Sequence, residues 1–552
     1  MISRFERIKA ITAGAMLLGA LFLTGEAAIA APKVPPQVSQ HVPQQVPMNA
    51  ANTAYNEAYK FLTARNYGEA ARVFYQLASQ ASGDVRAQSE FGLAESLRNL
   101  GYLHGASYFY LRIAMQGTSN RFFRNAMEQL GVINGASPMG RATVAPLFSN
   151  KVNIDPMSVP PGARGFYFYY KGLEAFEREQ VDSARAEFQR VPENSPYFSR
   201  AQYHLGVMSA ISTKPDLDAA VRAFRTALRS SHRDNFRMLS MMSLARIHYE
   251  RKEIRQAFEY YSQIPRESDL WLQSIFEGSW AYFVINKSNN TLGNIHTLHS
   301  PFFHSRFFPE SYVLEAITYL KLCYFNKVDL ALKSFQQRYK ATFQDLNNLL
   351  KKYQGQSPAF FNLHVQYRNS GSLREFPAAS EIIDSASRSD SFKEASFVIK
   401  SIDREEKSVA RAYSSRWENV GLMDVLRNAY EQRRISTIRR SGSDLFSQSV
   451  LAFRYLKDLS DQTKLIHYER ATSQTDALRA KFNVESTQTD TNVWGEGMKP
   501  LDLAKSLEYW PFEGEWWEDE LGGYVYNVSS KCGNGSAAAP AAAPDTNQKP
   551  KK

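Results

Sequence analysis

The feature that most constrains the fold is an internal repeat of 36 residues. Residues 55–80 read YNEAYKFLTARNYGEAARVFYQLASQ, and a shift of 36 residues aligns them with 91–116, FGLAESLRNLGYLHGASYFYLRIAMQ. Small positions match in register, among them Ala70 with Ala106. Each stretch holds two apolar-periodic segments around a short polar turn, which predicts a helix–turn–helix unit. A unit of this size cannot bury its apolar face alone, so neighbouring units must stack.

The same pattern returns further along the chain. Alanines in the expected second helices recur at Ala184, Ala220 and Ala257, which are 36 and 37 residues apart. Two weaker units are expected near 276–300 and 312–340. Small residues at this spacing allow two helices to approach closely, while the aromatic residues beside them fill the remaining space. Repetition on this scale predicts an array of helix pairs.

These units resemble the tetratricopeptide repeat over roughly 52–340. The resemblance implies an all-α fold, in which a tetratricopeptide-type helical solenoid presents an extended concave surface to a segment of another protein. Beyond Tyr339 the repeat pattern stops, and helix-forming charged residues dominate 390–435. A C-terminal module of long helices should therefore follow the solenoid.

Composition divides the chain into eight expected segments. Stretches rich in Pro, Gly or Gln mark the linkers, because they cannot hold a helix or a core. The segments are a signal peptide (1–30), a Pro/Gln-rich linker (31–51), an N-terminal repeat pair (52–134), a loop or hinge (135–165), the main repeat array (166–340), a helical C-terminal region (341–505), an aromatic and acidic terminal segment (506–532) and a tail without fixed structure (533–552).

The first thirty residues predict export. Arg4, Arg7 and Lys9 precede an apolar stretch of about 15 residues, and small residues follow it up to Ala31. The stretch is short for a transmembrane helix of roughly 20 residues, although an uncleaved membrane anchor remains the alternative. We expect the mature protein in the periplasm, free or associated with the outer membrane.

Charge and cysteine content narrow the class further. A formal net charge of +11 over 552 residues is a mild excess that suits anionic surfaces such as lipid headgroups or cell-wall polymers.

Only Cys323 and Cys532 are present, so the chain is not a disulfide scaffold. An oxidising compartment permits one bridge. We expect none, because Cys323 lies in an apolar helical pattern, where cysteine usually acts as a small hydrophobe.

The densest local signal lies near the C-terminus. Three of the seven tryptophans fall between 510 and 517, and no basic residue occurs from 506 to 530. Large aromatic side chains supply much of the binding energy at protein interfaces. The candidate partner-binding residues are Trp510, Phe512, Trp516, Trp517, Glu518 and Asp519. The alternative is that the aromatic residues clamp the segment onto the chain's own helices.

A narrower resemblance rests mainly on this segment. Repeats after an export signal, a long helical region and a terminal WPFxGEWWxDELGxY together resemble the repeat proteins of envelope-spanning gliding-motility machinery in delta-class bacteria. Residues 309–312 (PESY) and 335–339 (FQQRY) add to the likeness. The resemblance implies a periplasmic or outer-membrane-associated scaffold, and it carries no catalytic residue to transfer.

Two weaker candidates involve charged or metal-binding side chains. Arg433, Arg434, Arg439 and Arg440 form a basic run that could contact an anionic surface such as phospholipid headgroups. The alternatives are a solvated helix face and a partner for the acidic terminal segment.

His296, His299 and His304 form H-x2-H-x4-H. No cysteine or carboxylate completes a metal-ligand set at the usual spacing, so surface or capping roles are expected and no metal is predicted.

Motifs typical of enzymes do not occur in the sequence. It has no G-x-S-x-G elbow, no H-E-x-x-H zinc helix, no phosphate-binding Walker loop and no paired-cysteine knuckle. We expect a non-enzymatic interaction scaffold without a cofactor, a small-molecule substrate or a nucleic acid partner. The expected partners are other envelope proteins, with peptidoglycan or outer-membrane components as further candidates. An adaptor or regulator of cell-wall metabolism, or a hydrolase without a recognisable motif, remains the alternative.

Overall fold

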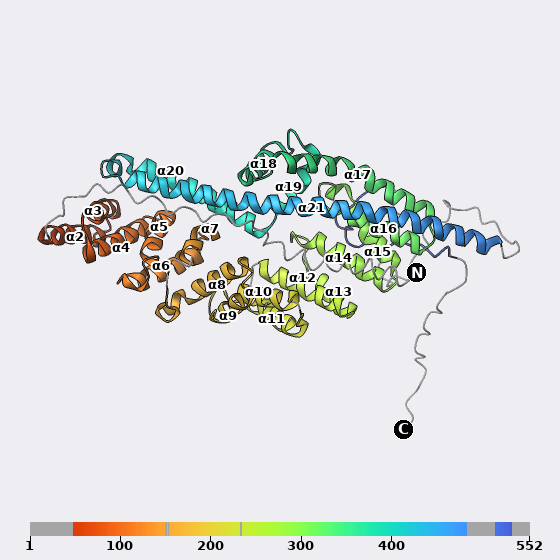
Figure 1. The fold of residues 1–552 in the computed structure, drawn as a ribbon, viewed down its shortest axis with the longest axis horizontal. Helices are drawn as coiled ribbons and strands as arrows, with labels where there is room; N and C mark the ends of the chain where they lie inside the picture. Colours follow the sequence, from red (N-terminus) through yellow and green to blue (C-terminus); the bar gives the residue numbers. More distant parts are fainter. Residues whose placement is uncertain are drawn as a thin grey trace, which may run out of the picture. The chain divides into compact units, whose positions relative to one another are not determined.

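The computed structural model describes residues 48–148, 152, 154–212, 214–231, 235–482 and 514–532. These residues form twenty α-helices and no strand, which confirms the all-α prediction (Figure 1). The helices of the first part are α2 (Met48–Thr63), α3 (Tyr67–Gln80), α4 (Gly83–Asn99), α5 (Leu103–Ala114), α6 (Phe123–Ala136), α7 (Arg141–Val144), α8 (Pro161–Glu177), α9 (Val181–Gln189), α10 (Phe198–Ile211), α11 (Leu217–Ser230), α12 (Asn235–Glu250) and α13 (Ile254–Tyr261). The helices that follow are α14 (Trp271–Val284), α15 (Ser288–Leu298), α16 (Glu310–Lys321), α17 (Phe325–Lys352), α18 (Ser357–Ser370), α19 (Ser380–Ser387), α20 (Asp390–Glu418) and α21 (Leu422–Phe482).

The helices belong to two compact units, and each unit is built from two separate stretches of chain. Unit 1 comprises Met1–Ser274 and Gln344–Phe453, and unit 2 comprises Ile275–Phe343 and Arg454–Lys552. The division falls inside α14, α17 and α21. The expected succession of domains along the sequence therefore differs from the observed organisation, in which the two units alternate.

Packing in the first part of unit 1 runs from each helix to the next. Each helix from α2 to α5 contacts its successor, α6 contacts α8, and the chain of contacts continues from α8 to α13. Small residues make these contacts close. A Cβ atom added at Gly172 would lie 2.8 Å from the Phe188 ring, and one added at Gly206 would lie 2.7 Å from the Phe224 ring. The predicted pairing of small and aromatic residues is thus observed between α8 and α9 and between α10 and α11.

The same turn joins the two helices of six pairs, namely α2–α3, α4–α5, α8–α9, α12–α13, α14–α15 and α16–α17. In each turn one residue has a positive φ, and the N–H of the next residue donates to the carbonyl five residues earlier, which is the arrangement of a Schellman motif. The positive-φ residues are Arg65, Gly101, Glu179, Lys252, Asn286 and Cys323, with φ values between 59° and 83°. Glycine is the usual residue in this left-handed conformation. The sequence did not mark these turns because only one of the six residues is glycine.

Two expected segment boundaries differ from the structure. Helix α2 begins at Met48, inside the stretch 31–51 that was expected to be an extended linker. The expected hinge 135–165 contains α7, two short 3-10 helices and the start of α8. Buried side chains, including Met139, Leu147 and Val159, pack the described residues of this stretch on the core.

Helix α20 packs on the first repeat helices of unit 1 (Figure 1). Four buried side chains in its middle recur every three or four residues and form one face of the helix. They are Val398, Ile402, Glu405 and Val409, and Phe392 and Trp417 are buried nearer its two ends.

At the end of α20, the Trp417 indole N–H donates to the Gly68 carbonyl of α3 at 3.1 Å. The Trp417 ring also stacks on Tyr413, with ring centroids 4.4 Å apart. The region predicted as long helices thus shares a core with the N-terminal repeats.

A buried polar network joins the same helices. The Glu405 carboxylate accepts from the backbone N–H groups of His104 at 2.9 Å and Gly105 at 2.8 Å, which lie in the first turn of α5. The Tyr430 hydroxyl of α21 donates to the same carboxylate at 2.8 Å. A carboxylate at a helix N-terminus satisfies amide groups that have no partner within the helix. Glu405 therefore holds both α20 and α21 against α5.

Among the described helices, none combines the length and the apolar character needed to cross a membrane.

Candidate functional site

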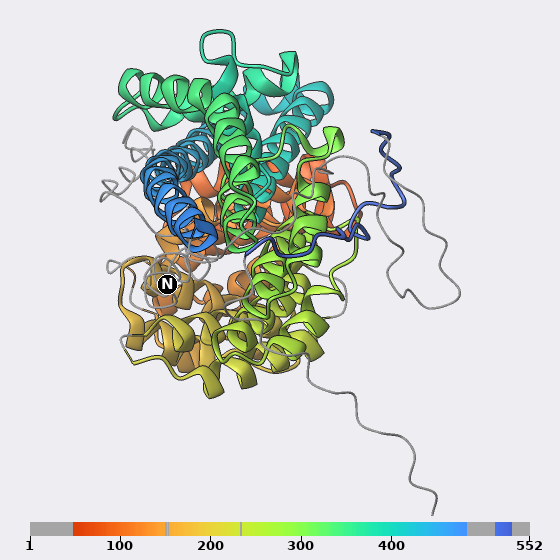
Figure 2. The same ribbon diagram turned by 90° about the vertical axis from the view of Figure 1, so that its right-hand side faces the viewer.

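The predicted aromatic and acidic segment is described from Gly514 to Cys532, and we call residues 514–532 the terminal strap. Trp510 and Phe512 lie outside the described residues. The strap belongs to unit 2 and contains no helix, and Figure 2 shows it as an extended blue trace. Its contacts below show that it docks on α15 and on the turn after α16.

A histidine of α15 anchors the start of the strap. The His296 ring stacks on Trp516, with centroids 4.3 Å apart and planes 19° apart, and it meets the Tyr524 ring edge-on at 4.9 Å. The Tyr526 hydroxyl lies 3.2 Å from His296 Nδ1. Burial lowers the pKa of His296 to about 4, so the ring is neutral near pH 7. A neutral imidazole can stack within this aromatic cluster without the cost of burying a charge.

Backbone hydrogen bonds continue the contact along α15. The Gly522 N–H donates to Thr297 Oγ1 at 2.9 Å. Further along, the Tyr526 N–H donates to the Asn289 carbonyl at 3.0 Å, and the Val528 N–H donates to Asn289 Oδ1 at 2.9 Å. Because buried backbone groups need partners, these bonds define one register of the strap on the helix.

The strap approaches α15 so closely that only glycine fits at one position. A Cβ atom added at Gly293 would lie 1.8 Å from the Tyr524 carbonyl oxygen, well inside any allowed contact. A side chain at this position would displace the strap. The sequence offered no sign that Gly293 serves a close approach, because the strap lies more than 200 residues away.

The end of the strap is fixed covalently by a disulfide between Cys323 and Cys532, whose Cα atoms are 5.2 Å apart. The expectation of no bridge was therefore wrong. Cys323 does not lie inside a helix but in the left-handed turn between α16 and α17, with φ 61°. Its side chain leaves the apolar face at that turn and reaches the strap.

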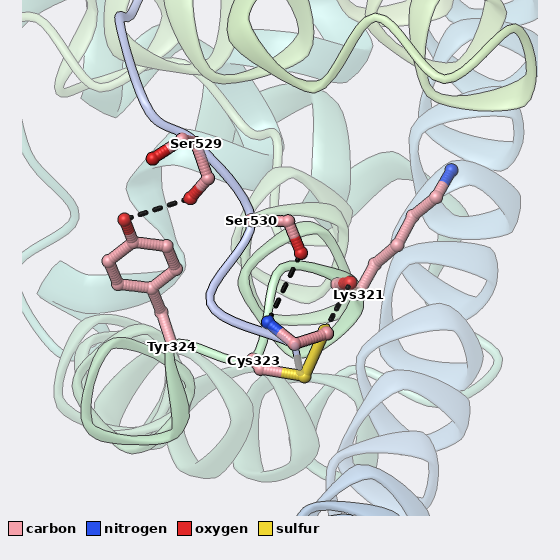
Figure 3. The surroundings of a disulfide bond; sticks show 6 residues. Lys321, Cys323, Tyr324, Ser529 and Ser530 are labelled. Atoms are coloured by element: carbon pink, nitrogen blue, oxygen red, sulfur yellow. Dashed lines mark hydrogen bonds between the residues drawn. A yellow bond between two sulfur atoms is a disulfide. The ribbon is translucent and has the colours of Figure 1, made fainter. Parts of the chain in front are cut away.

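Hydrogen bonds surround the disulfide (Figure 3). The Lys531 N–H donates to the Leu322 carbonyl at 2.9 Å, and the Tyr324 hydroxyl donates to the Ser529 carbonyl at 3.0 Å. The Lys531 ammonium group lies over the Tyr324 ring, 4.7 Å from its centroid. The strap is thus held at both ends, by the His296 cluster and by this covalent anchor.

Docking leaves one side of the strap exposed. Trp516 is half-buried against His296, whereas the adjacent Trp517 is 59% exposed. Glu515, Glu518 and Asp519 beside it are also exposed. Intramolecular docking, which was the alternative to partner contact, is therefore observed for Trp516. The other tryptophan is presented at the surface together with acidic side chains.

The three histidines of the H-x2-H-x4-H pattern have different surroundings. His296 lies in the aromatic cluster, and His304 Nδ1 donates to the Pro301 carbonyl at 2.7 Å. His299 stacks on Tyr312 at 4.0 Å and bonds Ser311 at 2.8 Å. Across the residues that the structure describes, no three His, Cys, Asp or Glu side chains are placed to hold a metal ion.

Two carboxyl groups of α16, the buried Glu310 and the partly buried Glu315, were not predicted from the sequence. Burial, with a smaller contribution from the nearby Glu277 carboxylate, raises the pKa of Glu310 to about 7. The Tyr455 hydroxyl of α21 donates to Glu310 and opposes the shift. Burial also raises the pKa of Glu315 to about 7. Both carboxyl groups keep a proton to higher pH in the folded state than in the unfolded chain.

A pH dependence follows for Glu310. Its folded pKa of about 7 lies above the usual 4.5, so its contribution to stability is fully present below pH 4.5 and is lost as pH rises through 7. Glu310→Gln cannot ionise. We expect this variant to gain about 2–3 kcal/mol of unfolding free energy relative to the unsubstituted protein between pH 5 and pH 8. Urea unfolding of both proteins at the two pH values measures this difference, and a constant difference would contradict the burial of an ionisable Glu310.

The predicted basic run is not presented as a group. Arg433 is only 6% exposed, and its guanidinium donates to the His104 carbonyl at 2.8 Å and to Ser107 Oγ at 2.9 Å. Arg434 forms an ion pair with Asp403 at 3.0 Å, and Arg440 pairs with Glu177.

Of the four arginines, only Arg439 is exposed. The interpretation of this run as a contact for an anionic surface is therefore wrong for Arg433, because the helix face that carries it packs on α5. The guanidinium groups of Arg434 and Arg440 also form ion pairs with carboxylates of unit 1.

No protein-family model matches the chain, and the curated proteins contain no match to it. What the geometry defines is an all-helical protein whose terminal strap is fixed on its own helices and presents an exposed tryptophan among acidic side chains.

Proposed function

We propose that this protein is an exported, tetratricopeptide-type scaffold that binds other proteins of a bacterial cell envelope. The observation that carries the proposal is the run of helices from α2 to α13, in which each helix packs on its neighbour and the same left-handed turn recurs. Arrays of this kind present extended surfaces that recognise segments of partner proteins through many modest contacts. The proposal assigns no catalytic step, cofactor or small-molecule substrate to the chain.

The disulfide supports the proposed compartment. Bridges such as Cys323–Cys532 persist in oxidising compartments, including the bacterial periplasm, and are rare in the cytosol. Together with the signal-like N-terminus, this favours the periplasm, with association at the outer membrane as the finer assignment. The resemblance of the repeats and the terminal segment extends the proposal to a place in a gliding-motility assembly.

The exposed face of the strap is the partner contact that we propose. Trp517 offers a large aromatic surface, and the acidic side chains beside it favour a partner with basic groups. The covalent anchor and the His296 cluster hold the strap in one conformation before binding. Such preorganisation reduces the entropy lost when the complex forms.

We expect Trp517→Ala to reduce recovery of the envelope partners at least tenfold when the mature protein is used as bait in native envelope extract. The matched control is Tyr468→Ala, which removes an aromatic side chain that is 65% exposed on α21. Both variants should retain the helical circular dichroism and melting temperature of the parent. If both recover the same partners as the parent, the strap is not the contact. If the parent recovers no specific partner, the scaffold proposal fails.

A further inference from the structure

Unit 1 carries an open groove that none of the preceding arguments uses. It has a volume of about 500 Å³ and is formed by the end of α17, by α18 and by the loop that follows α18. Tyr353, Asn362, Gln366, Asn369 and Arg374 contribute to its lining. The groove lies in unit 1, so it is independent of the terminal strap and of the function proposed for it.

Three carboxamide side chains line the groove along one face of α18. Asn362, Gln366 and Asn369 follow each other at intervals of four and three residues, which corresponds to rises of about 6 Å and 4.5 Å along the helix. Within the described part of the chain, none of these three side chains makes a hydrogen bond. A carboxamide has donors and an acceptor, as a peptide group does. The row therefore offers three unused sites that match the groups of a peptide backbone.

The spacing of this row fits an extended chain. Alternate residues of an extended peptide are about 6.6 Å apart, close to the interval between Asn362 and Gln366. Ala359, Leu363 and Val365 supply the apolar part of the lining. An extended peptide could place backbone groups on the carboxamides and one small side chain on this apolar surface.

The positive charge of the residues around the groove favours an acidic ligand. From residue 346 to residue 374 the chain contains no Asp or Glu, whereas Lys351, Lys352, Arg368 and Arg374 are basic. Lys352 is paired with Glu375 outside this stretch. Arg374 lines the groove, is exposed and has no ion pair with any described residue. A guanidinium in this position can bind a carboxylate through two parallel hydrogen bonds.

The aromatic residue of the groove argues against a sugar ligand. Sugar recognition would use a free aromatic face, but the Lys352 ammonium group lies over the Tyr353 ring, 5.4 Å from its centroid. The Phe360 ring meets Tyr353 edge-on at 6.3 Å. Tyr353 therefore acts as a wall of the groove rather than as a stacking platform.

We propose that this groove binds an extended, acidic peptide segment of a partner protein, with its backbone on Asn362, Gln366 and Asn369 and a carboxylate on Arg374. Such a segment resembles other extended-peptide ligands, in that backbone bonds supply affinity and one charged contact supplies selectivity.

The test selects peptides from a phage-displayed library of random 12-residue sequences on the full mature chain. Binding of the selected peptides is then measured by fluorescence anisotropy. We expect the selected sequences to contain Asp or Glu, and Arg374→Ala to weaken binding at least tenfold. Asn362→Ala combined with Gln366→Ala should have a similar effect. Arg368→Ala is the matched control, because it removes the same charge from α18 outside the groove lining, and it should leave affinity within twofold.

Several outcomes would overturn the proposal. These are the absence of any selected acidic sequence, equal affinity for the Arg374→Ala variant, and equal losses in the Arg374→Ala and Arg368→Ala variants. Self-association that depends on Arg374 in sedimentation experiments would assign the groove to a second copy of this chain. Binding of anionic phospholipid vesicles or peptidoglycan fragments that depends on Arg374, without selected peptides, would assign it to those ligands. Trp517→Ala should leave peptide affinity unchanged, so a failure here is distinct from a failure of the proposed strap contact.

Discussion

Replacing both Cys323 and Cys532 with serine should lower the unfolding free energy of unit 2 by about 5 kcal/mol. The bridge joins positions 209 residues apart, and the chain-entropy model assigns about 5 kcal/mol to closing a loop of this length in the unfolded state. Urea unfolding followed by circular dichroism measures the change. Treatment of the parent protein with dithiothreitol should produce the same loss.

The control separates the covalent bond from the packing around it. Cys532→Ser alone should equal the double variant in stability, because either substitution removes the bridge. After denaturation without a reductant, the oxidised parent should show no reactive thiol, whereas the single variant should show one. A double variant as stable as the parent would mean that the bridge does not constrain the unfolded chain.

Trp417→Ala should destabilise unit 1 by about 3–5 kcal/mol, the range for removing a large aromatic side chain from a core. Trp417 is 0% exposed and stacks on Tyr413, and its indole donates to the Gly68 carbonyl. The substitution leaves a void and removes the indole hydrogen bond to the Gly68 carbonyl, and both effects lower stability. Thermal unfolding by calorimetry is the measurement.

A matched substitution tests whether the loss of stability in Trp417→Ala comes from removing a buried side chain. Tyr413→Phe keeps the ring that stacks on Trp417 and removes only a hydroxyl, so it should cost less than about 1 kcal/mol. If Trp417→Ala changes the melting temperature no more than Tyr413→Phe does, the contact between α20 and the first repeats contributes little. The long helices would then be only loosely attached to those repeats.

Local patterns in the sequence predicted the all-α fold class, because small and apolar residues that recur at helical spacing indicate which positions are buried. Ala70, Ala106, Ala184 and Ala257 lie where helices meet, and all four are fully buried. The turns were harder to recognise. Arg65 and Lys252 adopt a left-handed conformation that usually calls for glycine, so no local residue identified them.

The features that were not predicted depend on contacts between residues far apart in the sequence. Cys323 follows an apolar helical pattern, yet its bonding partner is 209 residues away, and periodicity carries no information about that distance. Arg433 looked like part of a solvated face because its neighbours are charged, whereas α5 covers it. For the terminal segment, both interpretations rested on the same tryptophans. Only the fold separates the docked Trp516 from the exposed Trp517.

The interleaving of the two units has a consequence for how the chain can be made and divided. Unit 1 is complete only when Gln344–Phe453 has joined Met1–Ser274, and unit 2 needs Arg454–Lys552 to join Ile275–Phe343. During synthesis on the ribosome, the first helices of each unit emerge well before the helices that complete their cores. Contacts between such distant segments raise the contact order, which slows folding. No single cut in the gene yields either unit intact, so binding regions should be mapped by point substitution rather than by truncation.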